Sequence, residues 1–163
     1  MATRDQTARP IGKSHTKGMD AIALLEQDHR EVEDYFEEYE KAKSEEEKSE
    51  LASQICTALT VHTQLEEELF YPAARKATGD DDLLDEATVE HASAKQLIAE
   101  IEAMSVGDEF YDAKIKVLSE QIQHHVEEEE KKLFPETRKT DLDLDALGEE
   151  LTVRKSELMG DSA

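Results

Sequence analysis

The chain has 163 residues and carries 41 acidic against 19 basic side chains, which gives a formal net charge of -22 at pH 7. Such a charge opposes binding to nucleic-acid phosphates or anionic membranes and favours cations. The single cysteine, Cys56, excludes an internal disulfide and a cysteine-rich zinc or iron–sulfur site. No apolar run approaches the roughly 20 residues that a membrane-spanning helix needs, and residues 1–19 lack the apolar centre of a signal peptide. We therefore expect a cytoplasmic protein with no nucleic-acid partner and no membrane partner.

The composition predicts an all-α protein with one main domain. Helix-forming residues dominate, glycine, proline and aromatic residues are few, and strand-like β-branched runs bounded by turn residues are missing. Residues 1–19 are expected to be a basic, flexible and disordered tail with a net charge of +3. Residues 20–138 are expected to form a helical bundle, and residues 139–163 a C-terminal amphipathic helix and tail.

Four long helices and one short one follow from the capping signals in chain order. Asp20 is the expected N-cap of a first helix that runs to about Lys43, and Ser44 opens a second helix with a capping box. The stretch 78–82 separates the second helix from the third, and Gly107-Asp108 separates the third from the fourth. These lengths and short loops predict an antiparallel up-down-up-down four-helix bundle. A fifth helix within 141–159 is expected either to pack on this bundle or to join a partner chain.

Each long helix carries a histidine inside an otherwise apolar stripe at helical spacing. These histidines are His29, His62, His91 and His125. In the fourth helix His124 and His125 are adjacent, and only one of them can point inward. The positions three, seven and ten residues before His125 are all apolar, whereas those before His124 are mostly polar, so His125 is the predicted inward residue and His124 the reserve.

Two of these histidines belong to a local repeat with an offset of 63 residues. His62 is followed four residues later by Glu66, and His125 by Glu129, and a proline follows each histidine after ten residues. Residues i and i+4 lie on the same face of a helix, so each pair can reach one point. With a rise of 1.5 Å per residue, all four histidines lie about 22 to 27 Å from the connecting turns, in one layer of the bundle. The rest of the acidic run 127–130 is expected to be a solvated face.

Two buried glutamates among four histidines predict bound cations. Without compensation, burying these groups would carry a large desolvation penalty. Mixed imidazole and carboxylate ligands suit iron, manganese or zinc, whereas an oxygen-only shell is expected for calcium or magnesium. Six side chains are too many for one tetrahedral zinc ion. Two ions bridged by Glu66 and Glu129 would use all six side chains and leave coordination positions open. The alternative is a hydrogen-bonded core network without metal.

The same residues resemble the hemerythrin-like, or HHE cation-binding, family. The resemblance spans about residues 20–138 and is carried by a ligand set in the family's order: His29, His62, Glu66, His91, His125 and Glu129. It implies a non-haem di-iron centre, oxo- or hydroxo-bridged, that binds dioxygen or related small oxidants. Manganese and zinc are less favoured.

The departures from the family's oxygen carriers change the implied function. Those proteins have a further histidine where this chain has Lys95, and they end their motif with His-x4-Asp, a spacing that His124 and Glu129 would only mimic. The present set is more similar to bacterial proteins that repair iron centres under nitrosative stress. It favours binding or sensing of oxygen, peroxide, nitric oxide or iron in a stress response.

Three functions remain open at the level of sequence. The first is the di-iron binding protein, the second is a di-iron enzyme that turns over peroxide or nitric oxide or repairs iron centres, and the third is a structural interaction bundle without metal. The expected partner is a small molecule at the metal centre, and a homo-oligomer could form through the C-terminal helix. The four tyrosines are predicted to fill the core, and any of them could donate a hydrogen bond to the centre. They are Tyr35, Tyr39, Tyr71 and Tyr111.

Overall fold

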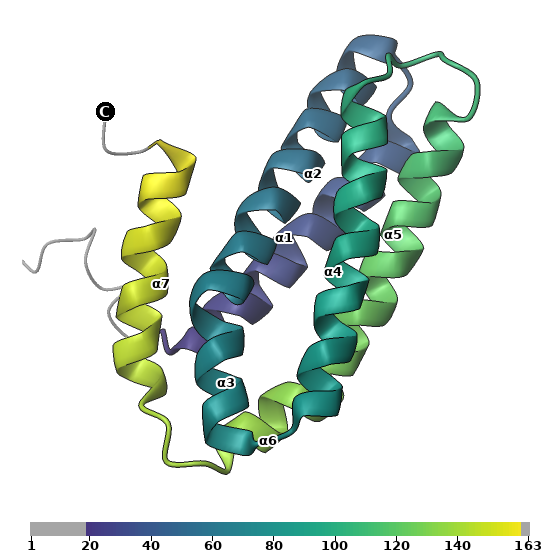
Figure 1. Cartoon of the computed structure of the whole chain (residues 1–163). Coiled ribbons are helices and arrows are strands. Elements are labelled where there is room, and N and C mark those ends of the chain that lie inside the picture. Colours follow the sequence, from purple (N-terminus) through teal and green to yellow (C-terminus); the bar gives the residue numbers. More distant parts are fainter. Residues whose placement is uncertain (1–18, 161–163) are drawn as a thin grey trace, which may run out of the picture.

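The computed structural model describes residues 19–160, and this part of the chain is all-helical. The predicted flexible tail lies almost entirely outside the described residues. Four long helices form an antiparallel bundle, with short helices at one end and a fifth helix alongside (Figure 1). The elements are α1 (Ala21–Lys41), α2 (Glu45–Leu65), η1 (Glu66–Phe70), α3 (Tyr71–Thr78), α4 (Asp81–Glu102), α5 (Tyr111–Glu128), η2 (Glu129–Leu133), α6 (Phe134–Arg138) and α7 (Leu144–Met159). The predicted fold class is confirmed.

The order of the helices around the bundle follows from which of them touch. α1 packs against α2 and α5, and α4 packs against α5 and α2, so the four helices close a ring in the order α1, α2, α4, α5. Every long helix therefore presents one face to a shared interior. Among the described helices, none combines the length and the apolar character required to cross a membrane.

The predicted N-caps of the first two helices are present. The Asp20 carboxylate accepts a hydrogen bond from the Ala23 backbone N–H at 2.8 Å, and the Ser44 hydroxyl accepts one from that of Glu47 at 3.1 Å. The fourth helix begins at Tyr111, three residues after Asp108, the last residue of the stretch that the sequence placed between the third and fourth helices. The reason is that the Asp108 side chain accepts from the Ser105 backbone N–H at 2.8 Å and so closes a turn before the helix.

Each half of the chain contains one turn of π-helix, directly at the glutamate of the His-x3-Glu pair. η1 begins at Glu66 and η2 at Glu129. Proline lacks a backbone N–H and its ring crowds the carbonyl four residues earlier, and the wider π turn relieves this conflict two residues before Pro72 and Pro135. The helices therefore continue through both prolines, as α3 and α6.

The six candidate ligands divide the hydrophobic core into two clusters. One cluster fills the end of the bundle near α3, α6 and α7, and includes Leu25, Leu65 and Phe134. The other fills the opposite end and includes Val32 and Ile122. His29 comes between Leu25 and Val32 on α1, so the polar layer lies between the two apolar clusters.

α7 packs on the bundle of its own chain, the first of the two possibilities that the sequence left open. It lies beside α1, α2 and η1 (Figure 1) and buries Leu147 and Leu151. The approach is very close at Gly148, where an added Cβ would lie 2.6 Å from the backbone oxygen of Met19 and 2.9 Å from the nitrogen of Ala21. Only glycine fits there, because backbone atoms cannot move aside as a flexible side chain would.

We expect Gly148→Ala to weaken the docking of α7, although alanine is the better helix former. Because the clash is with backbone atoms at the start of α1, its cost should be about 3 kcal/mol, which exceeds the roughly 1 kcal/mol gained in helix propensity and lowers the free energy of unfolding. Urea unfolding measures the change. Val153→Ala, at a 60% exposed position of the same helix, is the matched control and should leave stability within about 0.5 kcal/mol. Equal stability of the two variants would contradict the close packing.

Candidate metal centre

All six predicted ligands point into one buried layer between α1, α2, α4 and α5. Each is at most 5% exposed, and both glutamates are among the largest fully or almost fully buried side chains. His124, the reserve candidate, points away: its side chain is 63% exposed and its Nε2 lies 3.4 Å from a carboxylate oxygen of Glu90. The register argument that chose His125 over His124 therefore matches the observed geometry.

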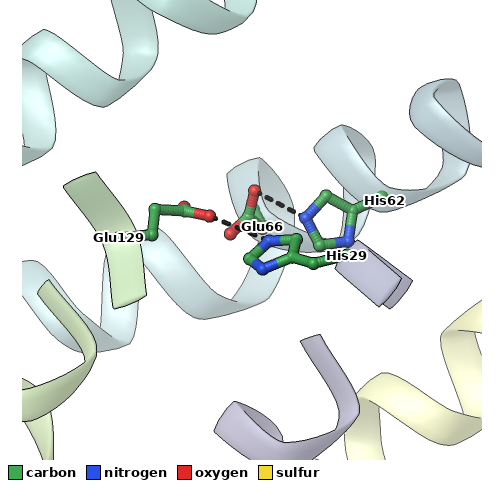
Figure 2. Close-up of side chains that lie close together, drawn as sticks. All are labelled: His29, His62, Glu66 and Glu129. Atoms are coloured by element: carbon green, nitrogen blue, oxygen red, sulfur yellow. Dashed lines mark ion pairs between the residues drawn. The ribbon is translucent and has the colours of Figure 1, made fainter. Parts of the chain in front are cut away.

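The first half of the layer is formed by His29 and His62 with the two glutamates (Figure 2). His29 Nε2 lies 3.2 Å from Glu129 Oε1, and His62 Nε2 lies 3.2 Å from Glu66 Oε1. One potential ligand atom from each of the four residues lies within 4.8 Å of the others. These residues come from α1, α2, η1 and η2, so the group forms only when the bundle closes.

The second half is formed by His91 and His125 with the same two glutamates. His91 Nε2 lies 3.1 Å from Glu66 Oε1, and His125 Nε2 lies 3.3 Å from Glu129 Oε2. This group of four also fits within 4.8 Å. Glu66 and Glu129 thus belong to both groups, and the centre is two four-residue groups that share their carboxylates.

The Tyr71 hydroxyl enters the second half and breaks the symmetry of the layer. It donates to Glu129 Oε2 at 2.6 Å and lies 3.0 Å from His91 Nε2 and 3.2 Å from His125 Nε2. The residue 63 positions later is Phe134, whose ring stacks on that of His29 with centroids 5.9 Å apart. Of the four tyrosines considered, Tyr71 is the one whose hydroxyl reaches the layer.

Behind each histidine stands a second carboxylate, and we call these four residues the outer carboxylates. Each lies within 3.1 Å of the Nδ1 atom of its histidine. The pairs are Glu130 with His29 at 2.7 Å, Asp28 with His62 at 3.1 Å, Glu67 with His91 at 3.0 Å, and Glu90 with His125 at 2.8 Å. An acceptor at Nδ1 fixes the tautomer that leaves the Nε2 lone pair free for a metal, the usual arrangement around metal-binding histidines.

Each outer carboxylate in turn contacts a basic side chain. We call these four side chains the outer basic groups: Arg30 at Glu130, Lys155 at Asp28, Lys95 at Glu67 and His124 at Glu90. Lys95 occupies the place of the additional histidine of the oxygen carriers, and here its Nζ holds Glu67 Oε1 at 2.6 Å. The layer is therefore surrounded by carboxylates that each have a basic partner, and not by unpaired carboxylates.

Sequence reasoning missed the outer carboxylates, and it assigned Glu130 to a solvated face. In the structure the Glu130 side chain is only 26% exposed and bonds His29. A signal was present, since each outer carboxylate is adjacent in sequence to a ligand: Asp28 and Glu90 precede a histidine, and Glu67 and Glu130 follow a glutamate. The two repeats of the chain also match in space. Asp28 contacts His62 as Glu90 contacts His125. Glu67 contacts His91 as Glu130 contacts His29.

The metal-free layer is held together by protons. Burial alone lowers the pKa of His62, but the charge of Glu66 and the hydrogen bond to Asp28 outweigh it and raise this pKa to about 10. The pKa of His125 is also raised, because Glu129 and its other carboxylate neighbours outweigh burial. Burial favours the neutral form of Glu66, yet the surrounding histidines hold its pKa well below the usual range. Cations that bind here would displace these protons.

The donor set fits metal ions, and unpaired buried atoms support this. Within the layer, four atoms make no well-directed hydrogen bond, although His29 Nε2 lies 3.2 Å from Glu129 Oε1 and His62 Nε2 lies 3.2 Å from Glu66 Oε1: His29 Nε2, His62 Nε2, Glu66 Oε2 and Glu129 Oε1. Buried polar atoms are rarely left unpaired, because each such atom costs about 1–3 kcal/mol. The two nitrogens belong to the His29–His62 group, and the two glutamates belong to both groups.

The sequence profile of the Hemerythrin HHE cation binding domain matches residues 20–137. The chain belongs to this family. The match covers α1 through α6 almost completely and includes all six residues of the layer. Membership establishes a cation-binding domain, in agreement with the resemblance drawn from the sequence.

Two individual proteins are similar to this HHE domain. A crystal structure of a Hemerythrin HHE cation binding domain-containing protein from Mycobacterium kansasii superposes with a TM-score of 0.76 at 23% identity, and covers 88% of this chain and 89% of that one. This likeness shows the fold. A protein named DNA nickase from Nostoc sp. (strain PCC 7120 / SAG 25.82 / UTEX 2576) is 29% identical over 133 residues, which is 78% of this chain but 38% of that protein. The chain thus spans about two fifths of the length of this relative.

The metal-free protein should become less stable as the pH rises. A histidine whose pKa is higher in the folded state than in the unfolded state stabilises the fold fully below its unfolded pKa, and this contribution is lost as the pH rises through its folded pKa. For His62 the window runs from 6.5 to about 10. Across it we expect the free energy of unfolding to fall by on the order of a few kcal/mol.

Urea titrations of chelator-treated protein at several pH values within this window measure the effect. His62→Gln should flatten the profile, because the variant has no imidazole to titrate at this position. A stability that is constant or increases over the window in the unsubstituted protein would contradict the charge assignment.

Proposed function

We propose that this HHE domain binds two non-haem iron ions in the layer and uses them to bind or sense a small oxidant, with dioxygen, peroxide and nitric oxide as the candidate ligands. The proposed iron ligands are His29, His62, Glu66, His91, His125 and Glu129. The proposed site of action is the cytoplasm, where thiols such as the free, buried Cys56 stay reduced.

One observation carries this proposal: the two four-residue groups share Glu66 and Glu129. Two carboxylates that each offer oxygens to both groups are suited to bridge two ions, and a histidine pair at each end supplies nitrogen ligands. This combination of imidazole and carboxylate is typical of iron and manganese rather than of calcium or magnesium. In a metal-free bundle these atoms need protons on the histidines to face one another at 3.2 Å, whereas metal ions would join them through directed bonds.

The chain's own residues prepare the site in three ways. The four histidines present Nε2 to the layer because the outer carboxylates hold their Nδ1 atoms. The two apolar clusters on either side exclude water. Tyr71 places a hydroxyl proton beside Glu129. A bound iron pair would supply the redox chemistry and the open coordination positions for a small ligand.

Glu66→Gln tests the shared-carboxylate centre. We expect the unsubstituted protein to hold about two iron ions per chain and the variant to hold fewer than one, because an amide cannot bridge two cations as a carboxylate does. Elemental analysis and the visible absorption spectrum under air measure both. Glu68→Gln is the matched control, since Glu68 lies two residues away in η1 but on the surface. Equal iron content in the two variants, or a protein that cannot be loaded, would overturn the proposal.

A second candidate function, the disproportionation of peroxide to water and dioxygen, is favoured by Tyr71. Burial and the charges of Glu129 and Glu66 raise the pKa of Tyr71 well above its usual range, so its hydroxyl keeps its proton inside the layer. Its hydroxyl lies 2.6 Å from Glu129 Oε2 and 3.0 Å from His91 Nε2, so it could donate a hydrogen bond or a proton to a small molecule that enters the layer. This hydroxyl is the observation that favours an enzyme as the second candidate.

If Tyr71 acts as this acid, Tyr71→Phe should slow peroxide consumption about a hundredfold at unchanged iron content. Tyr35→Phe is the control, since the Tyr35 hydroxyl only reaches Glu31 at 3.5 Å on the outside of α1. Oxygen release, measured with an electrode and normalised to bound iron, gives the rate. An unsubstituted protein that binds iron but shows no turnover would leave binding or sensing as the function.

The name of the Nostoc relative gives no support for a DNA partner here. The matched region is a minor part of that protein, and the present chain carries a net charge of -22, which repels nucleic-acid phosphates. We therefore keep a small molecule as the proposed partner. α7 has its buried face against its own bundle, so a homo-oligomer through α7 would have to use the exposed face.

A further inference from the structure

The outer basic groups are not all supplied by the four-helix bundle. Arg30, Lys95 and His124 lie on α1, α4 and α5, but the group that contacts Asp28 is Lys155 on α7. Lys155 Nζ lies 2.7 Å from Asp28 Oδ1, and Asp28 Oδ2 lies 3.1 Å from His62 Nδ1. A chain of two contacts therefore connects the fifth helix to a proposed ligand.

The internal repeat indicates why α7 is needed at this place. The 63-residue offset that relates His62 to His125 relates Val61 to His124. In the second half His124 lies beside Glu90, the outer carboxylate of His125. In the first half the equivalent position is a buried valine that cannot contact Asp28 with a polar atom. Lys155 supplies the basic group that the first half of the repeat lacks.

Asp28 has room to move if Lys155 does not hold it. A cavity of about 300 Å³ between α1, α2 and α7 is lined by Asp28, Tyr35 and Lys155 among others. The Asp28 side chain is only 9% exposed in the present arrangement. Without its partner, this carboxylate could turn into the cavity and become hydrated, and His62 would lose the acceptor that fixes its ring. The other three outer carboxylates each contact a basic group of the bundle itself.

We propose that Lys155 is a positioning residue for the metal position between His29 and His62, and that docking of α7 and occupation of this position stabilise each other. The position between His91 and His125 does not depend on α7. The two ions are therefore inequivalent, and detachment of the C-terminal helix would weaken one of them selectively. This inference rests on the proposed two-ion centre.

Lys155→Met and Arg154→Met separate positioning from simple anchoring of α7. Arg154 ties α7 to Glu68 at 2.8 Å, but this contact ends on the surface of η1 and does not reach a ligand. With ferrous iron under nitrogen and a competing chelator, we expect Lys155→Met to weaken one of two binding steps about tenfold, the lower end of the effect typical for groups behind metal ligands. The other iron-binding step should be unchanged. Arg154→Met should bind iron with the affinities of the unsubstituted protein. Lys155→Arg should also keep both affinities, because arginine supplies a basic group at the same position.

Amide hydrogen exchange of α7 gives a second, independent readout. Iron loading should slow exchange in Leu144–Met159 in the unsubstituted protein and in Arg154→Met, but not in Lys155→Met. Three results would each overturn this inference while leaving the two-ion centre intact. The first is that Lys155→Met leaves both iron-binding steps unchanged, and the second is that Arg154→Met loses as much iron affinity as Lys155→Met. The third is that iron loading does not change the amide exchange of α7. An unsubstituted protein that binds no iron would overturn both.

Discussion

The structure depends on two carboxylates, Glu66 and Glu129, that are buried at the centre of a helical bundle. Their exposures are 0% and 2%, and neither could remain ionised there without compensating positive charge. Four histidines from four helices surround them, and in the metal-free protein the pKa values of His29, His62 and His125 are raised by their carboxylate neighbours. Cations offer the same compensation with directed bonds. The layer therefore needs either protons or metal ions, and this requirement links folding, pH and metal binding in one place.

Charge alternates outward from this centre. The glutamates meet the Nε2 atoms of the histidines, the Nδ1 atoms meet the outer carboxylates, and the outer carboxylates meet the outer basic groups. Each outer contact lowers the free-energy cost of burying the groups further inside. A carboxylate that is held by a basic partner keeps its position as the hydrogen-bond acceptor of a histidine better than a carboxylate without one. A net charge of -22 is compatible with such a centre, because each outer carboxylate has one of the outer basic groups beside it.

The two halves of the centre are related by the repeat but are not identical. Tyr71 enters one half, whereas Phe134 stacks on His29 in the other. His124 contacts the outer carboxylate of one half from α5, a helix of the bundle, whereas Lys155 contacts that of the other half from α7. The two histidine nitrogens that make no well-directed hydrogen bond, those of His29 and His62, lie in the half without the tyrosine hydroxyl. These differences assign distinct environments to the two proposed ions.

The sequence by itself determined the helices, the polar positions in their apolar stripes and the choice of His125 over His124, because helical spacing is a local property that a residue pattern records. It also predicted that the four histidines reach one depth, because helix rise and short loops fix distance along the axis. It did not reveal the outer carboxylates, since Asp28 and Glu130 look like surface acids until a neighbouring helix brings a histidine to them. Only the tertiary structure decided those contacts, the π turns that carry the helices past the prolines, and the docking of Lys155 on Asp28 across 127 residues. Such contacts join side chains that are distant in sequence, and only the packing of whole helices determines which of them meet.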